Sequence, residues 1–313
     1  MKVTFFTAII NVHVASISGR GDEISDGFYI TTDQDVVSEL LSPDVRRAIG
    51  GLECDFLRAA PAIIYSRKDV GDDFNWSDYL DRCLINVKMF LNVMWLLKDN
   101  GADSELGFLT YGAGFNQRTH SNAVSVVYGM ADGSVSKVSF SRKELKEIRA
   151  YRRALVGEIA DPTPYGILAV ETGRYMRAFY WVQAGRAAAG LGERIASFCT
   201  AMESLVATSS SELAHQLSER MALFLSEEPE DRLRIYREVK RAYGLRSKVV
   251  HGDVLRQSKV GELLESSLAC DDLLRKAIQK AAADEHARKA LAGGNENLDQ
   301  YFLRLLFAQG SKE

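Results

Sequence analysis

The sequence has 313 residues, of which 46% are apolar and 26% are charged, so it can bury a large core in one or two domains. A formal net charge of −3 excludes a globally polycationic nucleic-acid coat, although a local basic face remains open. No apolar run reaches the roughly 20 residues of a membrane helix, which predicts a cytoplasmic protein without a membrane contact. The four cysteines form no CxxC pair or zinc-type cluster, so no metal or cofactor is expected.

The first 140 residues predict a mixed α/β domain. Apolar and β-branched runs predict strands over 3–14, 27–32, 62–66 and 106–112, and a hairpin formed by 121–130 and 134–141. The dipeptide Asp132-Gly133 would make the hairpin turn, because both turn residues must accept positive φ. The segment "GRGD" at 19–22 reads as a flexible turn. Helices are predicted over 33–49 and 75–100, the second with Ser77 as N-cap.

From Ser141 onward the pattern is helical. Ser141 and Glu144 form a capping-box signature that opens a helix over 141–159, and the prolines of "ADPTPYG" at 160–166 interrupt it. Further helices are predicted over 170–188, 191–207, 211–226, 229–251, 257–291 and 296–308. The sequence therefore predicts the α+β class, with a mixed α/β domain at 1–140 and a helical bundle at 141–313.

The helix at 229–251 carries the candidate site in its last turns, "LRSKVVHGD". A core stripe is formed by Ile235, Val239, Ala242, Leu245 and Val249. Arg246 lies beside this stripe and needs a partner, because an unpaired buried charge is costly.

His251 belongs to another face of this helix, together with Gly244, Ser247 and Lys248. Five residues give about 140° of rotation, so Arg246 and His251 do not share a face. Gly252 is the natural residue after the helix, which places His251 at the negative end of the helix dipole. A titratable imidazole at that end suits acid–base catalysis.

The same helix is rich in positive charge. Between 232 and 248 its one acidic residue is Glu238, against the basic residues Arg232, Arg234, Arg237, Lys240, Arg241, Arg246 and Lys248. This strip suits a polyanion backbone, and it equally suits a solvated helix face.

Four segments carry a resemblance to a known family: "RYMRAFYWVQAG" (174–185), "RIASFCTAMESLVA" (194–207), "SELAHQLSERMALFL" (211–225) and "DRLRIYREVKRAYGLRSKVVHGD" (231–253). In this order they resemble the HEPN superfamily, specifically the Apea-like HEPN domains of prokaryotes. The resemblance implies a dimerising helical bundle. In many members it also implies a metal-independent endoribonuclease, used in phage defence, toxin systems or stress responses.

The resemblance places the family's Arg-x4–6-His motif on Arg246 and His251, in a site composed from both protomers of a homodimer. Lys248, Ser247 and Arg241 are candidates for contacts with the RNA, and Glu203 is the candidate partner of Arg246. The domain at 1–140 would be a sensor or regulatory domain, and an inhibitory partner or a phage-derived trigger would control the site.

Ser247 departs from the family, since active members often have Asn, Asp or His after the motif arginine. A second interpretation is therefore a catalytically inactive HEPN module that dimerises, binds RNA and regulates. A third is an unrelated helical scaffold in which "RSKVVHG" matches by chance.

Overall fold

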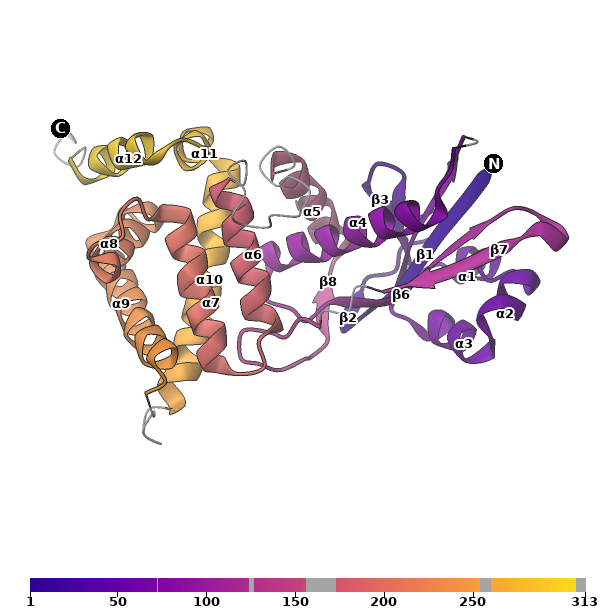
Figure 1. The fold of residues 1–313 in the computed structure, drawn as a ribbon, viewed down its shortest axis with the longest axis horizontal. Coiled ribbons are helices and arrows are strands. Elements are labelled where there is room, and N and C mark those ends of the chain that lie inside the picture. The colour runs from indigo at the N-terminus through magenta and orange to yellow at the C-terminus, as the bar shows by residue number, and fades with distance from the viewer. Residues whose placement is uncertain (72, 124–126, 156–172, 254–259, 308–313) are drawn as a thin grey trace. The chain divides into compact units, whose positions relative to one another are not determined.

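The computed structural model describes residues 1–71, 73–123, 127–155, 173–253 and 260–307 (Figure 1). The chain divides into two compact units. Unit 1 comprises Met1–Tyr128 and Val135–Arg152, and unit 2 comprises Gly129–Ser134 and Arg153–Glu313. Unit 1 contains a β-sheet and unit 2 is helical, so the predicted α+β class and the order of its two regions are confirmed. The predicted break at 160–166 lies outside the described residues.

Unit 1 is built on a six-stranded antiparallel sheet with the order β3-β4-β5-β1-β6-β7. The strands are β1 (Lys2–Ile10), β3 (Asp22–Ser25), β4 (Phe28–Thr31), β5 (Ala62–Asp69), β6 (Asp103–Tyr111) and β7 (Arg118–Asn122). The apolar β1 lies between β5 and β6. The edge strands β3 and β7 were not predicted. Both are short and mostly polar, and neither has the alternation of buried and exposed residues that identifies a strand.

The predicted strand over 3–14 is interrupted at Asn11, whose φ is 59°. Asparagine adopts this left-handed conformation more readily than most residues, and its side-chain amide donates to the Gly101 carbonyl at 3.1 Å. After the break, β2 (Val12–Val14) leaves the main sheet. It pairs in parallel with β8 (Val138–Phe140).

The predicted hairpin of 121–130 with 134–141 is wrong. A turn does form there, since Gly133 has φ 86° and the Met130 N–H donates to the Ser134 carbonyl at 2.8 Å. Asp132, however, does not adopt the positive φ expected of it. The flanking strands do not pair with each other, since β7 pairs with β6 and β8 pairs with β2. The turn thus follows from its local sequence. The pairing of β8 with β2 does not, and it accompanies the burial of Phe140 in the core.

Helices cover both faces of the sheet (Figure 1). On one face, α1 (Gln34–Leu40), α2 (Pro43–Ile49) and α3 (Gly51–Ala59) share a core with Phe6 and Phe108. On the other, α4 (Trp76–Leu97) approaches closely at Gly107. A Cβ on Gly107 would lie 2.7 Å from Leu84 of α4 and 2.8 Å from Phe5.

The single helix predicted over 33–49 is wrong, because the chain forms α1 and α2 there and then the unpredicted α3. Pro43 lacks an N–H and its ring blocks the preceding helical turn, so α1 ends before it. Ser42 then caps α2, its hydroxyl accepting from the Val45 N–H at 3.3 Å. At the start of α4, the cap is Asn75 rather than the predicted Ser77, whose N–H donates to the Asn75 side chain at 3.0 Å.

Helix α5 (Arg142–Leu155) begins with the predicted capping box. The Glu144 carboxylate accepts from the Ser141 N–H at 2.7 Å, and the Ser141 hydroxyl accepts from the Glu144 N–H at 3.3 Å. Arg142 pairs with Asp22 of β3 at 2.7 Å, and Arg149 pairs with the neighbouring Glu23 at 2.6 Å. These ion pairs tie α5 to the sheet, so unit 1 extends to Arg152 instead of ending at the boundary expected at residue 140.

Unit 2 contains α6 (Arg174–Ala187), α7 (Leu191–Val206), α8 (Leu213–Leu225), α9 (Pro229–His251), α10 (Val260–Ala283), α11 (Glu285–Ala292) and α12 (Asn295–Phe307). Helix α7 packs against α6, α9 and α10 (Figure 1). It contributes the fully buried Phe198 and Met202. The helix predicted over 257–291 breaks at Asp284, whose side chain caps α11. Within the described parts of the chain, every helix is too short or too polar to span a lipid bilayer.

Candidate functional site at the end of helix α9

Helix α9 has the predicted bounds of 229 and 251. Pro229 opens it, and acidic residues in its first turn complement the positive end of the helix dipole. At the other end, Gly252 has φ 74° and its N–H donates to the Val249 carbonyl at 3.2 Å. The glycine closes the helix in a left-handed conformation that other residues rarely adopt. His251 is therefore the last residue of a regular helix.

Arg246 turns toward α7, where it meets Glu203. Its Nη2 lies 3.7 Å from Glu203 Oε1, and the side chains are 26% and 18% exposed. That separation is an ion pair but exceeds a hydrogen bond. Among the described residues, Arg246 Nε and Glu203 Oε1 are buried atoms without a hydrogen-bond partner. Unsatisfied buried polar atoms are uncommon and costly, so this pair retains capacity for a further polar group.

Tyr243 completes this small cluster and was not predicted as a site residue. The Arg246 guanidinium carbon lies 5.2 Å from the Tyr243 ring centroid. Burial raises the pKa of Tyr243, the negative charge of Glu203 adds to the rise, and Arg246 opposes it. The signal was present in the sequence, because Tyr243 precedes Arg246 by three residues and so shares its helix face.

His251 lies on an exposed face of α9. The residues Arg237, Arg241, Gly244, Lys248 and His251 recur at alternating steps of four and three, and all five are exposed. This spacing places them along one stripe, which we call the outer stripe of α9. Ser247 is half-buried between the outer stripe and Arg246.

Within one protomer, the structure brings Glu203 to Arg246 but does not bring Arg246 to His251. Because α9 is regular to its end, the rotation of about 140° between the two residues is kept. Arg246 faces the neighbouring α7, whereas His251 faces away from the core. A single phosphate can therefore meet both groups only if a second copy of α9 supplies one of them.

The positive charge of α9 is smaller than its sequence indicates, because acidic residues pair with part of it. Arg234 pairs with Asp231 and Glu238 at 3.3 and 3.1 Å, whereas Arg232 donates to the uncharged Ser226 carbonyl at 2.7 Å. Arg241 pairs with Glu265 of α10 at 3.1 Å.

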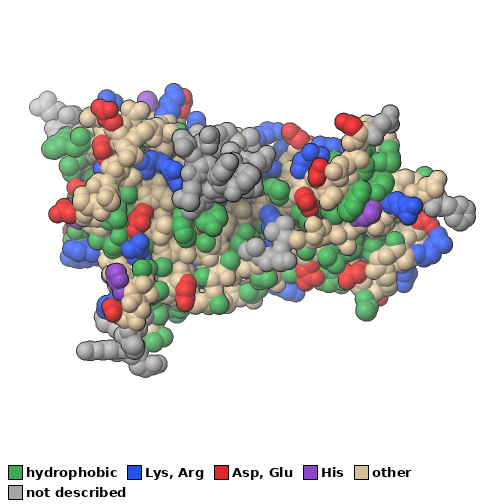
Figure 2. Space-filling model, viewed as in Figure 1, with side chains coloured by type: hydrophobic (Ala, Val, Ile, Leu, Met, Phe, Trp, Pro, Cys, Tyr) green, Lys and Arg blue, Asp and Glu red, His purple; other side chains and the backbone are tan. Residues whose placement is uncertain are grey.

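Two cations of the outer stripe are left over. Among the described residues, Arg237 and Lys248 make no ion pair. On the face drawn in Figure 2, described positive and negative side chains are interspersed rather than gathered by sign. The charge that α9 offers to a polyanion is thus local.

An exposed apolar row accompanies the outer stripe. Leu264 and Leu268 of α10 are 40% and 44% exposed and lie one turn apart. Between them, Glu265 makes the ion pair with Arg241, so the row lies next to α9. Val250 and Val260, at the facing ends of α9 and α10, are also exposed.

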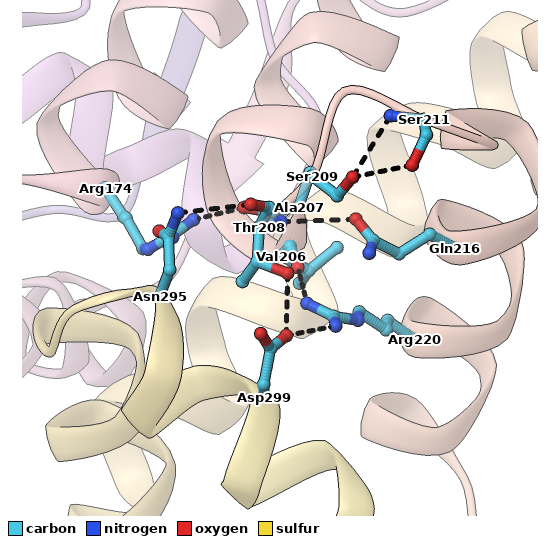
Figure 3. Close-up of polar contacts among 10 residues, drawn as sticks. All are labelled: Arg174, Val206, Ala207, Thr208, Ser209, Ser211, Gln216, Arg220, Asn295 and Asp299. Atoms are coloured by element: carbon cyan, nitrogen blue, oxygen red, sulfur yellow. Dashed lines mark hydrogen bonds and ion pairs between the residues drawn. The ribbon is translucent and has the colours of Figure 1, made fainter.

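The turn of α7 that carries Glu203 is anchored by two arginines (Figure 3). Arg174 of α6 donates to the carbonyls of Ser204 and Ala207 at 3.3 and 2.8 Å. Arg220 of α8 donates to the Val206 carbonyl at 2.8 Å. These carbonyls lack partners within the helix, and the positive charges complement the negative end of its dipole.

Helix α12 completes this anchor (Figure 3). Asn295 accepts from Arg174, and Asp299 accepts from both Arg220 and the Thr208 hydroxyl, the latter at 2.6 Å. Burial lowers the pKa of Arg174, and the positive charge of Arg220 adds to this effect. The cluster holds the end of α7 in place, and with it the position of Glu203 against α9.

Two other histidines contact aromatic residues. His120 lies in β7 and stacks on Trp76 with ring centroids 3.8 Å apart. It also pairs with the Tyr111 hydroxyl at 3.0 Å. His215 of α8 contacts the Tyr236 hydroxyl of α9 at 3.1 Å. Both rings pack against aromatic residues within their own unit.

Comparisons with protein-family models, curated proteins and solved structures give no match for this chain. Its function must therefore be argued from the residues and their geometry.

Proposed function

We propose that the chain is a metal-independent endoribonuclease of the HEPN type, acting as a homodimer on RNA in the cytoplasm, in phage defence, as a toxin or in a stress response. The observation that carries the proposal is the end of α9, where a regular helix holds an exposed His251 on the outer stripe. Behind it, Arg246 is held by Glu203 with unused hydrogen-bonding capacity.

In this proposal the ribose 2′-hydroxyl is the nucleophile. His251 takes its proton, or delivers a proton to the leaving 5′-oxygen. The 2′-oxygen attacks phosphorus, the bond to the 5′-oxygen breaks, and the products carry a 2′,3′-cyclic phosphate and a 5′-hydroxyl. Arg246 binds the non-bridging oxygens and stabilises the negative charge that grows in the transition state.

The remaining residues of the outer stripe would hold the substrate. Lys248 lies one turn before His251, and Arg241 lies two turns before Lys248 on the same face. Lys248 would contact the neighbouring phosphate as a point charge. Arg241 would exchange Glu265 for a phosphate, because an exposed ion pair contributes little stability. Ser247, between the two faces, would donate its hydroxyl.

A second copy of the chain would complete the site. Arg246 and His251 diverge within one protomer, and a two-fold axis along α9 would bring the arginine of one copy to the histidine of the other. The exposed row of Leu264 and Leu268 offers apolar surface beside α9 for such a contact.

The proposal is tested with purified full-length protein, tRNA and mixed RNA in the presence of EDTA. We expect cleavage that survives EDTA and yields cyclic phosphate ends, with DNA left intact. His251→Ala should lower the rate by about a hundredfold or more, the usual contribution of an acid–base group. Lys289→Ala, at an exposed site in α11, serves as the matched control and should cleave at the wild-type rate.

The opposite outcome would be no cleavage by the wild type, or cleavage unaffected by His251→Ala, and either rejects the enzyme. One observation favours a second function in that case, a catalytically silent module that dimerises and binds RNA. Arg246 is already paired with Glu203, and such a pair can serve the fold alone. RNA binding that persists without cleavage, and weakens in Lys248→Gln, would support the module.

A further inference from the structure

The segment "GRGD" at 19–22 is held in one conformation by the sheet of unit 1. Gly21 has φ 88°, and a Cβ there would lie 2.2 Å from the Ile30 carbonyl oxygen, so only glycine fits. The carbonyl of Gly19 accepts from the Thr31 hydroxyl at 3.1 Å. The loop therefore has a fixed conformation, unlike the flexible turn that its sequence indicates. It forms one wall of a pocket.

This wall presents Arg20 to a row of aromatic rings. The Arg20 guanidinium lies 4.1 Å from the centroid of Tyr29, and Tyr29 lies 5.8 Å from Tyr65, its cross-strand partner. Arg67 lies over Tyr65 at 5.5 Å. The Tyr65 hydroxyl donates to the Arg20 carbonyl at 2.8 Å, which fixes the loop to the sheet. Two guanidiniums thus flank two phenol rings on one side of a pocket.

The part of the pocket lining that α1 supplies is acidic. Asp35 and Glu39 lie one turn apart on α1 and face the same way. Glu39 pairs with Arg67 at 3.2 Å, with side chains 65% and 37% exposed, so the pair is weak and a ligand can displace it. Asp33 is already used, because its carboxylate accepts from the N–H groups of Gly19 and Asp35, and the first of these bonds contributes most to lowering its pKa.

The pocket between these walls has a volume of about 560 Å³, which falls in the usual range of small-molecule sites. Among the described residues, Arg20 makes no ion pair, and its guanidinium lies against the ring of Tyr29. We propose that this pocket binds a zwitterionic small molecule of amino-acid or short-peptide size. Its carboxylate would bind Arg20 and Arg67, and its ammonium group would bind Asp35 and Glu39.

The distribution of charge argues against a nucleotide. A phosphate at Arg20 would share the pocket with three carboxylates, Asp33, Asp35 and Glu39, and their repulsion would offset the attraction of the two arginines. A zwitterion places one charge of each sign beside its opposite. The inference concerns unit 1 and does not depend on the nuclease activity proposed for α9.

The test measures binding of twenty free amino acids and of alanyl-alanine to the full-length protein by titration calorimetry. We expect at least one of these probes to bind at millimolar concentration or below. Its N-acetyl derivative, which lacks the ammonium group, and its amide, which lacks the carboxylate, should each bind about tenfold or more weakly. Nucleoside 5′-monophosphates are the opposing probes.

Variants locate the site. Arg20→Gln and Asp35→Asn should each weaken binding about tenfold or more, through loss of one charge-assisted contact. Arg47→Gln is the matched control, because Arg47 is an exposed arginine on α2 whose partner is Asp44, and its affinity should equal that of the wild type. Equal thermal unfolding without ligand shows that each variant is folded.

Three outcomes overturn the proposal: no zwitterionic probe binds, nucleotides bind in their place, or Arg20→Gln binds like the wild type. RNA cleavage is measured on the same samples. Because the two results are independent, failure of the nuclease proposal leaves this test unaffected.

Discussion

Two helix ends in unit 2 have cationic residues beside them, and the environments of these residues differ. At the end of α7, Arg174 is buried and Arg220 is half-buried, and both bind backbone carbonyls and residues of α12 (Figure 3). At the end of α9, Lys248 and His251 are exposed. The negative end of a helix favours cations in both places. A cation stabilises the fold where neighbouring helices cover it and supply hydrogen-bond partners. Where no helix covers it, the cation stays exposed and can bind a ligand.

The largest expected effect tests whether the open end of α9 is completed by a second copy. Arg246→Ala and His251→Ala should each lower RNA cleavage by about a hundredfold or more. Mixing the two inactive proteins should restore up to about a quarter of the wild-type rate, because half of the dimers are mixed and each mixed dimer holds one intact site. The rate is measured after the subunits have exchanged.

The control for this experiment is the double variant Arg246→Ala, His251→Ala mixed with either single variant. Such mixtures contain no dimer with an intact composite site and should stay inactive. Recovery in the control would show that the activity does not come from these two residues. A lack of recovery in the main mixture despite confirmed heterodimers would show that each protomer uses its own arginine and histidine. The end of α9 would then rearrange within one chain.

The second prediction concerns a variant that removes one of the arginines bound to the end of α7. Arg220→Met should lower the free energy of unfolding of unit 2 by about 2 kcal/mol, because the Val206 carbonyl and Asp299 both lose a charged donor. The matched change at the open end, Lys248→Met, should cost less than about 0.5 kcal/mol. Both are measured by urea denaturation. Equal losses in the two variants would remove the distinction between the two ends.

Sequence periodicity predicted the helices of unit 2 well because their signals are local. The bounds of α9 follow from Pro229, a regular core stripe and Gly252, all within one segment. The capping box of Ser141 and Glu144 is likewise local. For the candidate site, the contact of Arg246 with Glu203 could be expected, since a half-buried arginine on the core side must face a neighbouring helix.

The missed features depend on contacts between distant residues. The partner of β8 is β2, which lies more than a hundred residues earlier, and no turn signal could indicate it. The roles of Arg174 and Arg220 depend on α12 folding back onto the end of α7. The pocket around Arg20 likewise depends on tertiary structure, because the 19–22 loop, the strands β4 and β5 and helix α1 all contribute to its lining. Short-range patterns identify helices and caps, whereas the use of each charged side chain is decided by the tertiary fold.

The smallest expected effect is the pH dependence of the stability that Asp299 contributes at the end of α7. Burial alone would raise the pKa of Asp299, but hydrogen bonds from Thr208 and Arg220 outweigh it and lower that pKa below its usual 3.8. A lowered folded-state pKa means that this carboxylate stabilises the protein fully above 3.8, and that the stabilisation disappears as pH falls through the still lower folded value.

Asp299→Asn isolates this contribution, because other carboxylates of lowered pKa, such as Asp22 and Glu144, titrate in both proteins. The melting temperature of the wild type should exceed that of the variant at neutral pH, and the gap should close below pH 3.8. The gap should be small, since the Asp299 side chain is 41% exposed and solvent screens the pair. A gap that is constant across this pH range would show that Asp299 acts at α7 through its shape and not its charge.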